Sequence, residues 1–395
     1  MSTSPIAHSA DLGRLRAEGY DIAVVDGHLL VRDVPYVTST RKVRIAVLAC
    51  PLDLAGDTTI APTTHVMKFA GEYPCGPSGE ELDAIRHSAI DDSIGGVAFT
   101  FAFSSKPPSG AYPDFYEKVI AYVRMLSDQA RSLDPNADAR TFPVIEAPTD
   151  ESIFIYEDTA TARAGTTNAN IKLTGQRVGI IGVGGTGTYI LDAAAKTPVS
   201  EIHLFDGDVL LTHNAFRAPG AVSIDELRAK PKKVDHWAAT YAKLRRGVIP
   251  HPYNITPENV AELEGMDIVF LAVDETAEKL PIIEYLEREG IIFIDCGMGL
   301  TLTDSDEVRG QLRVTASTPS KRDHIRALGR IPLGNPAVDD EYATNIQVVE
   351  MNALNAMLAV VRWKKIFGFY ADSEHEHDMG YVIGGNEIIN QDHAA

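Results

Sequence analysis

Hydrophobic residues in the first third of the chain fall in short runs separated by turn residues. Predicted strands are Ile22–Val25, Leu29–Arg32, Val43–Ala49 and Val97–Phe103. Asp26 and Gly27 stand between the first two, as in a two-residue hairpin turn. An amphipathic helix is expected over Asp114–Leu133, because its apolar residues recur every three or four positions. We therefore predict an α+β domain over residues 1–135.

The rest of the chain has a different pattern, in which continuous apolar runs alternate with helical segments. Buried parallel strands are predicted at Val178–Val183, Glu201–Phe205 and Asp267–Val273. A long helix over Asn345–Ile366 carries apolar residues that suit a core or a dimer interface. Residues 136–160 are rich in Pro, Asp and Ala and are predicted as a linker. We therefore predict an α/β domain over residues 161–395.

A cluster of glycines follows the first of these parallel strands. The glycines are Gly182, Gly184, Gly185 and Gly187, and they open a helix. Glycine lets the backbone approach a nucleotide closely, and the N–H groups at a helix start favour phosphate oxygens. The same glycine pattern also occurs in proteins that bind NAD or FAD, so alone it does not identify the ligand.

Charged and polar residues after the next strands favour a triphosphate over NAD. Asp206, with Asp208 beside it, ends the second strand roughly 20 residues after the glycines, where a ribose hydroxyl is expected. Asp274 follows the third strand, in a position suited to a magnesium ligand. Potential phosphate ligands between them are Asn214, Arg217, Lys230, Lys232 and Lys233. NAD carries only two phosphates, whereas ATP needs more cations and a metal.

Together these motifs make residues 160–370 similar to the ThiF/MoeB/E1 superfamily, which activates ubiquitin-like proteins and sulfur carriers. The resemblance implies a Rossmann-like E1/ThiF adenylation domain of the α/β class, with ATP and Mg²⁺ as cofactors. It implies that ATP and the C-terminal glycine carboxylate of a small β-grasp protein form an acyl-adenylate and pyrophosphate. Implied nucleotide ligands are Gly182, Gly184, Gly185, Gly187, Asp206, Asp208, Asn214, Arg217 and Lys233.

The resemblance also assigns catalytic roles. Asp274 is expected to hold magnesium, and Lys233, beside Val234, is preferred to Lys232 as the phosphate ligand. An arginine finger usually precedes the first strand and reaches into the partner subunit, and Arg163 is the candidate here. A homodimer is therefore expected.

The positions of the cysteines do not decide how the adenylate reacts further. The chain has three, too few for a zinc-binding tetrad, and none follows Cys296. Cys296 lies inside a predicted strand, where an inert buried thiol is expected. The adenylate either passes directly to another protein or forms an oxyester in the segment Leu300–Asp340, where His324 is the nearest base. Its candidate hydroxyls are Thr315, Ser317, Thr318 and Ser320. Direct transfer is preferred.

Composition limits the partners. The formal net charge of −19 argues against nucleic acid. The start of the chain lacks the pattern of a secretion signal, and no apolar run has membrane-spanning length. We expect a cytoplasmic enzyme. The N-terminal domain is expected to recruit the ubiquitin-like substrate or an E2-like acceptor. It faintly resembles a ubiquitin-conjugating enzyme, and also a bacterial domain fused to ThiF-like enzymes in operons that encode ubiquitin-like proteins.

Two further motifs are interpreted as structural. His65 and Cys75 could form a catalytic pair, but no third group that would orient them is evident. His375 and His377 lie in a polar stretch predicted to be a solvated loop rather than a metal site. Alternative functions are an NAD-dependent oxidoreductase, a non-catalytic nucleotide-fold scaffold protein, and adenylation of a small molecule or RNA.

Overall fold

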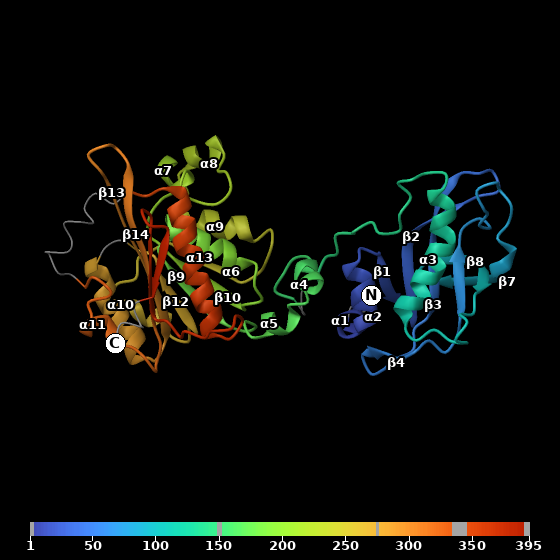
Figure 1. Cartoon of the computed structure of the whole chain (residues 1–395), viewed down its shortest axis with the longest axis horizontal. Coiled ribbons are helices and arrows are strands. Elements are labelled where there is room, and N and C mark those ends of the chain that lie inside the picture. Colours follow the sequence, from blue (N-terminus) through green and yellow to red (C-terminus); the bar gives the residue numbers. More distant parts are fainter. Residues whose placement is uncertain (1–3, 148–151, 274–275, 334–345, 391–395) are drawn as a thin grey trace. The chain divides into compact units, whose positions relative to one another are not determined.

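The computed structural model describes residues 4–147, 152–273, 276–333 and 346–390. The chain forms two compact units (Figure 1). Unit 1 comprises Met1–Pro148 and Glu157–Gly165, and unit 2 comprises Thr149–Tyr156 and Thr166–Ala395. No helix of the described segments has the length and hydrophobicity needed to cross a membrane.

Unit 1 is built on a six-stranded antiparallel sheet with the order β1-β2-β3-β6-β8-β7. The predicted hairpin is confirmed, and Asp26 (φ 48°) and Gly27 (φ 70°) form its turn with positive φ angles. The strands are β1 (Ile22–Val25), β2 (His28–Val37), β3 (Val43–Pro51), β6 (Val66–Ala70), β7 (Arg86–Ile94) and β8 (Val97–Ser104). A separate short pair is formed by β4 (Leu54–Ala55) and β5 (Thr58–Thr59).

The predicted helix is present as α3 (Phe115–Arg131), which packs against β2. Asp114 caps it by accepting a hydrogen bond from the backbone N–H of Glu117 at 2.8 Å. Unit 1 also contains α1 (Ser4–His8), α2 (Ala10–Ala17), η1 (Asp83–Ile85) and α4 (Thr159–Ala164), the last against α2.

The segment after α3 differs from the predicted linker. Ala137 and Ala139 are buried, Arg140 forms a backbone bridge with Tyr20, and the N–H of Phe142 donates to Gly19. Small side chains let this stretch pack closely, so the structure places it in unit 1. The predicted domain boundaries at 135 and 161 came from composition, which does not detect such contacts.

Unit 2 is built on an eight-stranded sheet with the order β11-β10-β9-β12-β13-β14-β15-β16. The strands from β11 to β13 are parallel, and the remaining pairs are antiparallel. The chain crosses from one side of β9 to the other before β12, and ligands of such sheets bind at this reversal. The strands are β9 (Arg177–Ile181), β10 (Glu201–Phe205), β11 (Val248–His251), β12 (Ile268–Leu271), β13 (Ile292–Leu302), β14 (Val308–Ser317), β15 (Asp378–Val382) and β16 (Glu387–Asn390).

Helices cover both faces of this sheet, which confirms the predicted α/β class (Figure 1). The core with Ile180 and Phe270 lies beneath α6, α9 and α13, while the core with Val269 and Phe293 lies beneath α10, η2 and α11. The helices are α5 (Thr167–Ile171), α6 (Gly185–Ala195), α7 (Thr212–Ala215), α8 (Ile224–Ala229), α9 (Lys233–Tyr241), η2 (Val260–Leu263), α10 (Thr276–Arg288), α11 (His324–Ala327) and α13 (Val349–Ile366).

Candidate functional site

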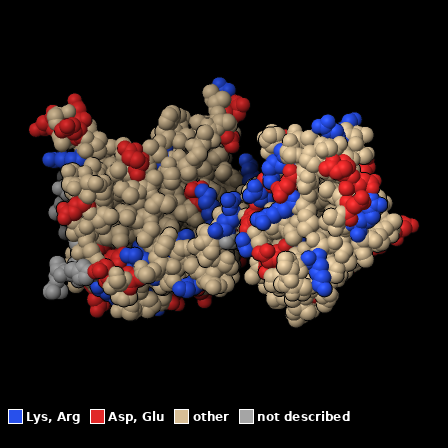
Figure 2. Space-filling view, turned by 45° about the vertical axis from the view of Figure 1, so that its right-hand side comes forward, with Lys and Arg blue, Asp and Glu red and all other residues tan. Residues whose placement is uncertain are grey.

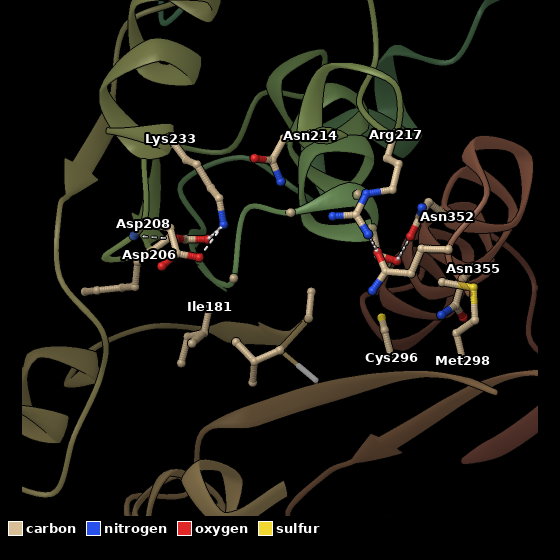
Figure 3. Close-up of a pocket in the computed structure, with 18 of the residues that line it drawn as sticks. Ile181, Asp206, Asp208, Asn214, Arg217, Lys233, Cys296, Met298, Asn352 and Asn355 are labelled. Atoms are coloured by element: carbon tan, nitrogen blue, oxygen red, sulfur yellow. Dashed lines mark hydrogen bonds and ion pairs between the residues drawn. The ribbon is translucent and has the colours of Figure 1, made fainter. Parts of the chain in front are cut away.

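A cavity of about 320 Å³ opens at the carboxyl ends of β9, β10 and β12. Its size is in the range of small-molecule sites. Figure 3 shows two ends: Asp206, Asp208 and Lys233 lie at one, and Arg217 and Asn355 at the other. Most of the predicted site residues of unit 2 are therefore in one place.

The glycine loop forms one wall of this cavity. Gly182 has a φ of +86°, and a Cβ there would lie 2.6 Å from the carbonyl oxygen of Ala272. A Cβ on Gly187 would lie 1.8 Å from the carbonyl oxygen of Gly182, so Gly187 allows α6 to pack onto the loop. Gly184 and Gly185 line the cavity at the first turn of α6, whose N–H groups suit an anion.

Helix α13 supports the loop from the other side. A Cβ on Gly185 would lie 2.4 Å from the side chain of Asn352, so the two elements are in close contact. The hydroxyl of Thr186 donates to Oδ1 of Asn352 at 3.0 Å, and the Asn352 amide donates to the carbonyl of Val348. Asn352 thus fixes the loop through a complete set of bonds.

Asp206 joins the loop to the end of β10. Its two carboxylate oxygens accept the backbone N–H groups of Val183 and Asp208, each at 2.9 Å. Lys233, at the start of α9, places Nζ 2.7 Å from Asp208 and 3.4 Å from Asp206. Lys232 instead donates to the carbonyl of Gly207. Of these two lysines, Lys233 is the one that lines the cavity.

Asn214 and Arg217 lie on the opposite rim. Asn214 Oδ1 accepts from the backbone N–H of Leu211 at 2.9 Å, so its amide group faces away from that bond. Arg217 donates from Nη1 to Oε1 of Gln347 at 2.6 Å. Its Nε is buried without a hydrogen-bond partner, and it forms no ion pair with any described residue. A cation with spare donors therefore faces the cavity, where it suits an anionic ligand.

The structure gives no position relative to this cavity for two predicted catalytic residues, Asp274 and Arg163. Asp274 lies outside the described residues, although Val273 lines the cavity. Arg163 lies on α4 in unit 1, with its guanidinium 5.6 Å from the ring centre of Phe142. The described residues contain no group of three metal-ligating side chains, but magnesium in nucleotide sites needs only one or two carboxylates beside phosphate oxygens. Asp208, whose side chain is largely exposed, meets that lesser requirement.

Three of the four candidate hydroxyls after Leu300 are buried. Thr315 and Ser317 are fully buried in β14, and Thr315 donates to Asp378 at 2.5 Å. Thr318 is buried beside His377, so of these hydroxyls Ser320 is the exposed one. The reason is that β13 turns back into β14 and widens the sheet. The expected base is also engaged: His324 contacts the carbonyl of Ala316.

The prediction of a solvated loop at 374–378 is wrong in part. His375 is exposed, but Glu376, His377 and Asp378 are buried. Glu376 pairs with two cations of α13, Arg362 and Lys365. These pairs give the buried carboxylate of Glu376 two cationic partners. In unit 1, the described structure shows no hydrogen bond between His65 and Cys75; the Cys75 thiol donates to the carbonyl of Tyr73, in agreement with a structural role.

Sequence reasoning missed the part of the cavity made by α13 and β13. Three apolar residues of α13 are exposed, with Val349 at 40% and Met357 and Val361 at 37%. Asparagines on another side of the helix are buried, and their spacing of three residues was the available signal. Additional lining residues are His213, Asn254, Cys296, Met298, Gln347, Asn352 and Asn355.

Cys296 lines the cavity but remains a poor nucleophile. Burial raises the pKa of its thiol to about 12. The thiol is therefore protonated at neutral pH, as the predicted inert role requires.

Comparisons with known proteins match two parts of the chain to different families. Residues 159–361 match the ThiF family, and residues 10–159 match a domain of unknown function, DUF6791. The chain is 25% identical over 225 residues to a tRNA threonylcarbamoyladenosine dehydratase of Haemophilus influenzae, covering 51% of this chain and 85% of that protein.

Solved structures with a similar fold include Escherichia coli MccB with ATP, at 19% identity and a TM-score of 0.45, covering 56% of this chain and 65% of that one. PaaA is similar at 16% identity and a TM-score of 0.46, covering 58% of this chain and 78% of that one. The chain thus spans about two thirds of the MccB chain.

Proposed function

The chain belongs to the ThiF family, and we propose that it uses ATP to adenylate the C-terminal glycine carboxylate of a ubiquitin-like or sulfur-carrier protein. The observation that carries the proposal is the guanidinium of Arg217, which forms no ion pair with any described residue and lines a cavity whose other end holds Lys233 between two carboxylates. A ligand with a ribose at one end and several phosphates at the other suits these charges.

The reaction needs cations more than it needs a base. A carboxylate oxygen attacks the α-phosphorus, an O–P bond forms, and the bond to the β-phosphate oxygen breaks to release pyrophosphate. The nucleophile is already ionised, so no proton moves. Two anions must approach, and Arg217, Asn214 and Lys233 lower that repulsion. Asp206 would accept a ribose hydroxyl, and Asp274 would hold magnesium, which would supply positive charge beside the phosphates.

The adenylate is then transferred directly to an acceptor on another protein. The neutral thiol of Cys296 and the buried hydroxyls of Thr315 and Ser317 disfavour a covalent intermediate on unit 2. Unit 1 recruits the ubiquitin-like protein or the acceptor. The enzyme acts in the cytoplasm as a homodimer, in which Arg163 completes the partner's site.

A second candidate substrate is a tRNA that carries threonylcarbamoyladenosine, because the chain is 25% identical to a dehydratase of that nucleoside. The net charge of −19 disfavours it. Figure 2 shows Asp and Glu side chains on the visible face of both units.

The test is ATP–pyrophosphate exchange with ubiquitin-like proteins ending in glycine, and separately with the modified tRNA. We expect exchange with the protein only. Arg217→Ala should lower exchange by roughly 100-fold with a smaller loss of ATP affinity, because charge on the leaving pyrophosphate develops in the transition state. Arg228→Ala is the matched control, since Arg228 is exposed on α8.

Three results would change the assignment. Exchange with the tRNA alone would select the second candidate. Saturable NAD binding without ATP binding would favour an oxidoreductase, and ATP binding without exchange for any carboxylate would favour a scaffold. Asp274→Ala should abolish pyrophosphate exchange while the protein stays folded, and retention of full exchange would remove the metal assignment.

A further inference from the structure

Asn355 of α13 has an unused hydrogen-bond acceptor inside the cavity. Its side chain is 1% exposed and lies beside Cys296 and Met298 (Figure 3). Its amide nitrogen donates to the carbonyl oxygen of Gly297 at 3.0 Å. A carbonyl oxygen can only accept, so the NH₂ group faces Gly297 and the orientation of the amide is determined. Oδ1 then has no hydrogen-bond partner among residues that the structure describes.

The neighbouring asparagine makes this feature informative. Asn352 lies one turn earlier, is equally buried, and uses both ends of its amide within the protein. Asn355 uses only one. A buried acceptor without a donor destabilises the folded chain, so such groups in native proteins generally have an external partner. The partner must carry an N–H or O–H group at this end of the cavity.

The donors of ATP are not expected at this end of the cavity. Its phosphates carry no hydrogen at neutral pH, and its ribose hydroxyls, with the adenine amino group beyond the ribose, are assigned to the other end, at Asp206. The carboxylate that is activated has no hydrogen either. In a peptide the nearest donor is the backbone N–H of the terminal residue, one carbon away from the carboxylate. We propose that Oδ1 of Asn355 accepts this N–H, and so positions the terminal carboxylate for attack; this inference rests on the proposed adenylation.

The substrate class follows from this bond. The enzyme selects N-acylated α-amino acids, the group at the end of every peptide chain, and rejects carboxylates that lack the adjacent N–H. Asn355 is a positioning residue in this scheme, because it holds the substrate and exchanges no proton with it. A site built around an N–H donor rejects an analogue without it strongly, since the acceptor is then left unpaired.

Two stable mimics of the acyl-adenylate test the bond in the full-length protein. One is N-acetylglycyl sulfamoyl adenosine, and the other is its ester analogue, in which an oxygen replaces the N–H. Calorimetry should show that the wild-type protein binds the amide at least about tenfold more tightly. Asn355→Leu, of similar volume, should bind both mimics equally. Met357→Leu, on the exposed side of the same helix, should discriminate as the wild type does.

The outcomes separate the inference from the function on which it rests. Equal binding of the two mimics by the wild type overturns the inference even if the Asn355 variant does not fold, and so does undiminished discrimination in Asn355→Leu. Sulfamoyl adenosine without an acyl group is the reference. If neither it nor either mimic binds the wild type, the nucleotide site itself is rejected, and the inference with it.

Discussion

Lys118 of unit 1 and Lys233 of unit 2 are both buried, and they have different surroundings. Lys118 on α3 of unit 1 is 0% exposed and donates to the carbonyl of Thr64 at 2.8 Å. Lys233 of unit 2 is 7% exposed and lies between the carboxylates of Asp206 and Asp208. Lys118 completes a core, whereas Lys233 faces a cavity. Burial of a charge therefore does not identify a site; the groups around the charge do.

The direction of the strands in the two sheets explains why the two lysines have different surroundings. In the parallel part of unit 2, the carboxyl ends of β9, β10 and β12 meet at one edge, so residues distant in sequence converge there. In the antiparallel sheet of unit 1, consecutive strands end at opposite edges, so no such common edge is formed. Polar groups there bond within the core: the hydroxyl of Tyr122 donates to the carbonyl of His65 at 2.5 Å.

The largest effect is expected at the glycine loop. Gly187→Ala would force a Cβ to 1.8 Å from a carbonyl oxygen, so the loop and α6 must separate. We expect a loss of at least about 3 kcal/mol in the stability of unit 2, and loss of ATP binding. Gly27→Ala in the hairpin of unit 1 meets no atom within 4 Å and should cost only about 1 kcal/mol, from its positive φ. Thermal unfolding and ATP calorimetry measure both; equal losses would contradict the packing argument.

The next largest effects are expected when each lysine is replaced by methionine, and they should differ between the two units. Lys233→Met should lower pyrophosphate exchange by roughly 100-fold, about 3 kcal/mol, with little change in the unfolding temperature. Lys118→Met should leave exchange unchanged and lower the stability of unit 1 by about 1–3 kcal/mol, since the carbonyl of Thr64 loses its donor. If Lys118→Met impairs exchange as strongly, unit 1 contributes to chemistry and the comparison fails. If Lys232→Met lowers pyrophosphate exchange and Lys233→Met does not, Lys232 is the phosphate ligand instead of Lys233.

These comparisons show what the sequence could predict. The hairpin, β10 and α3 followed from local periodicity, because each element buries one face against a neighbour. The glycines, Asp206, Arg217 and Lys233 could be predicted to lie together, because parallel strands impose a common edge. The role of Asn355 could not, since it depends on how α13 packs on β13. The burial of Glu376 likewise depends on Arg362, a partner that no local pattern reveals.

The alkaline limit of stability gives a smaller effect that both units share. Burial raises the pKa of the Cys296 thiol from its ordinary value of 9.0 to about 12 and also raises the pKa of the Cys50 thiol in unit 1. A raised pKa means that the folded state holds the proton more tightly. This stability is present below about pH 9 and is lost between pH 9 and 12, by up to about 1.4 kcal/mol per pH unit. Cys296→Ala should flatten that decline for unit 2 between pH 9 and 10.5 in urea unfolding, and Cys50→Ala for unit 1. An unchanged slope in both variants would show that these thiols are not the cause.

The smallest effect is expected for Cys296 in the reaction itself, although it lines the cavity. A thiol with a pKa near 12 supplies almost no thiolate at neutral pH, so Cys296→Ala should change pyrophosphate exchange and onward transfer by less than about twofold. Intact-mass analysis after incubation with ATP and the ubiquitin-like protein should therefore find no adduct that a thiol reductant removes. An adduct on Ser320, the exposed hydroxyl of the predicted set, would survive reductant and yield to hydroxylamine, and would replace direct transfer by an oxyester. An adduct on Cys50, Cys75 or Cys296 would be a thioester, and it would mean that the enzyme opens a buried thiol during turnover, because all three are buried in this structure.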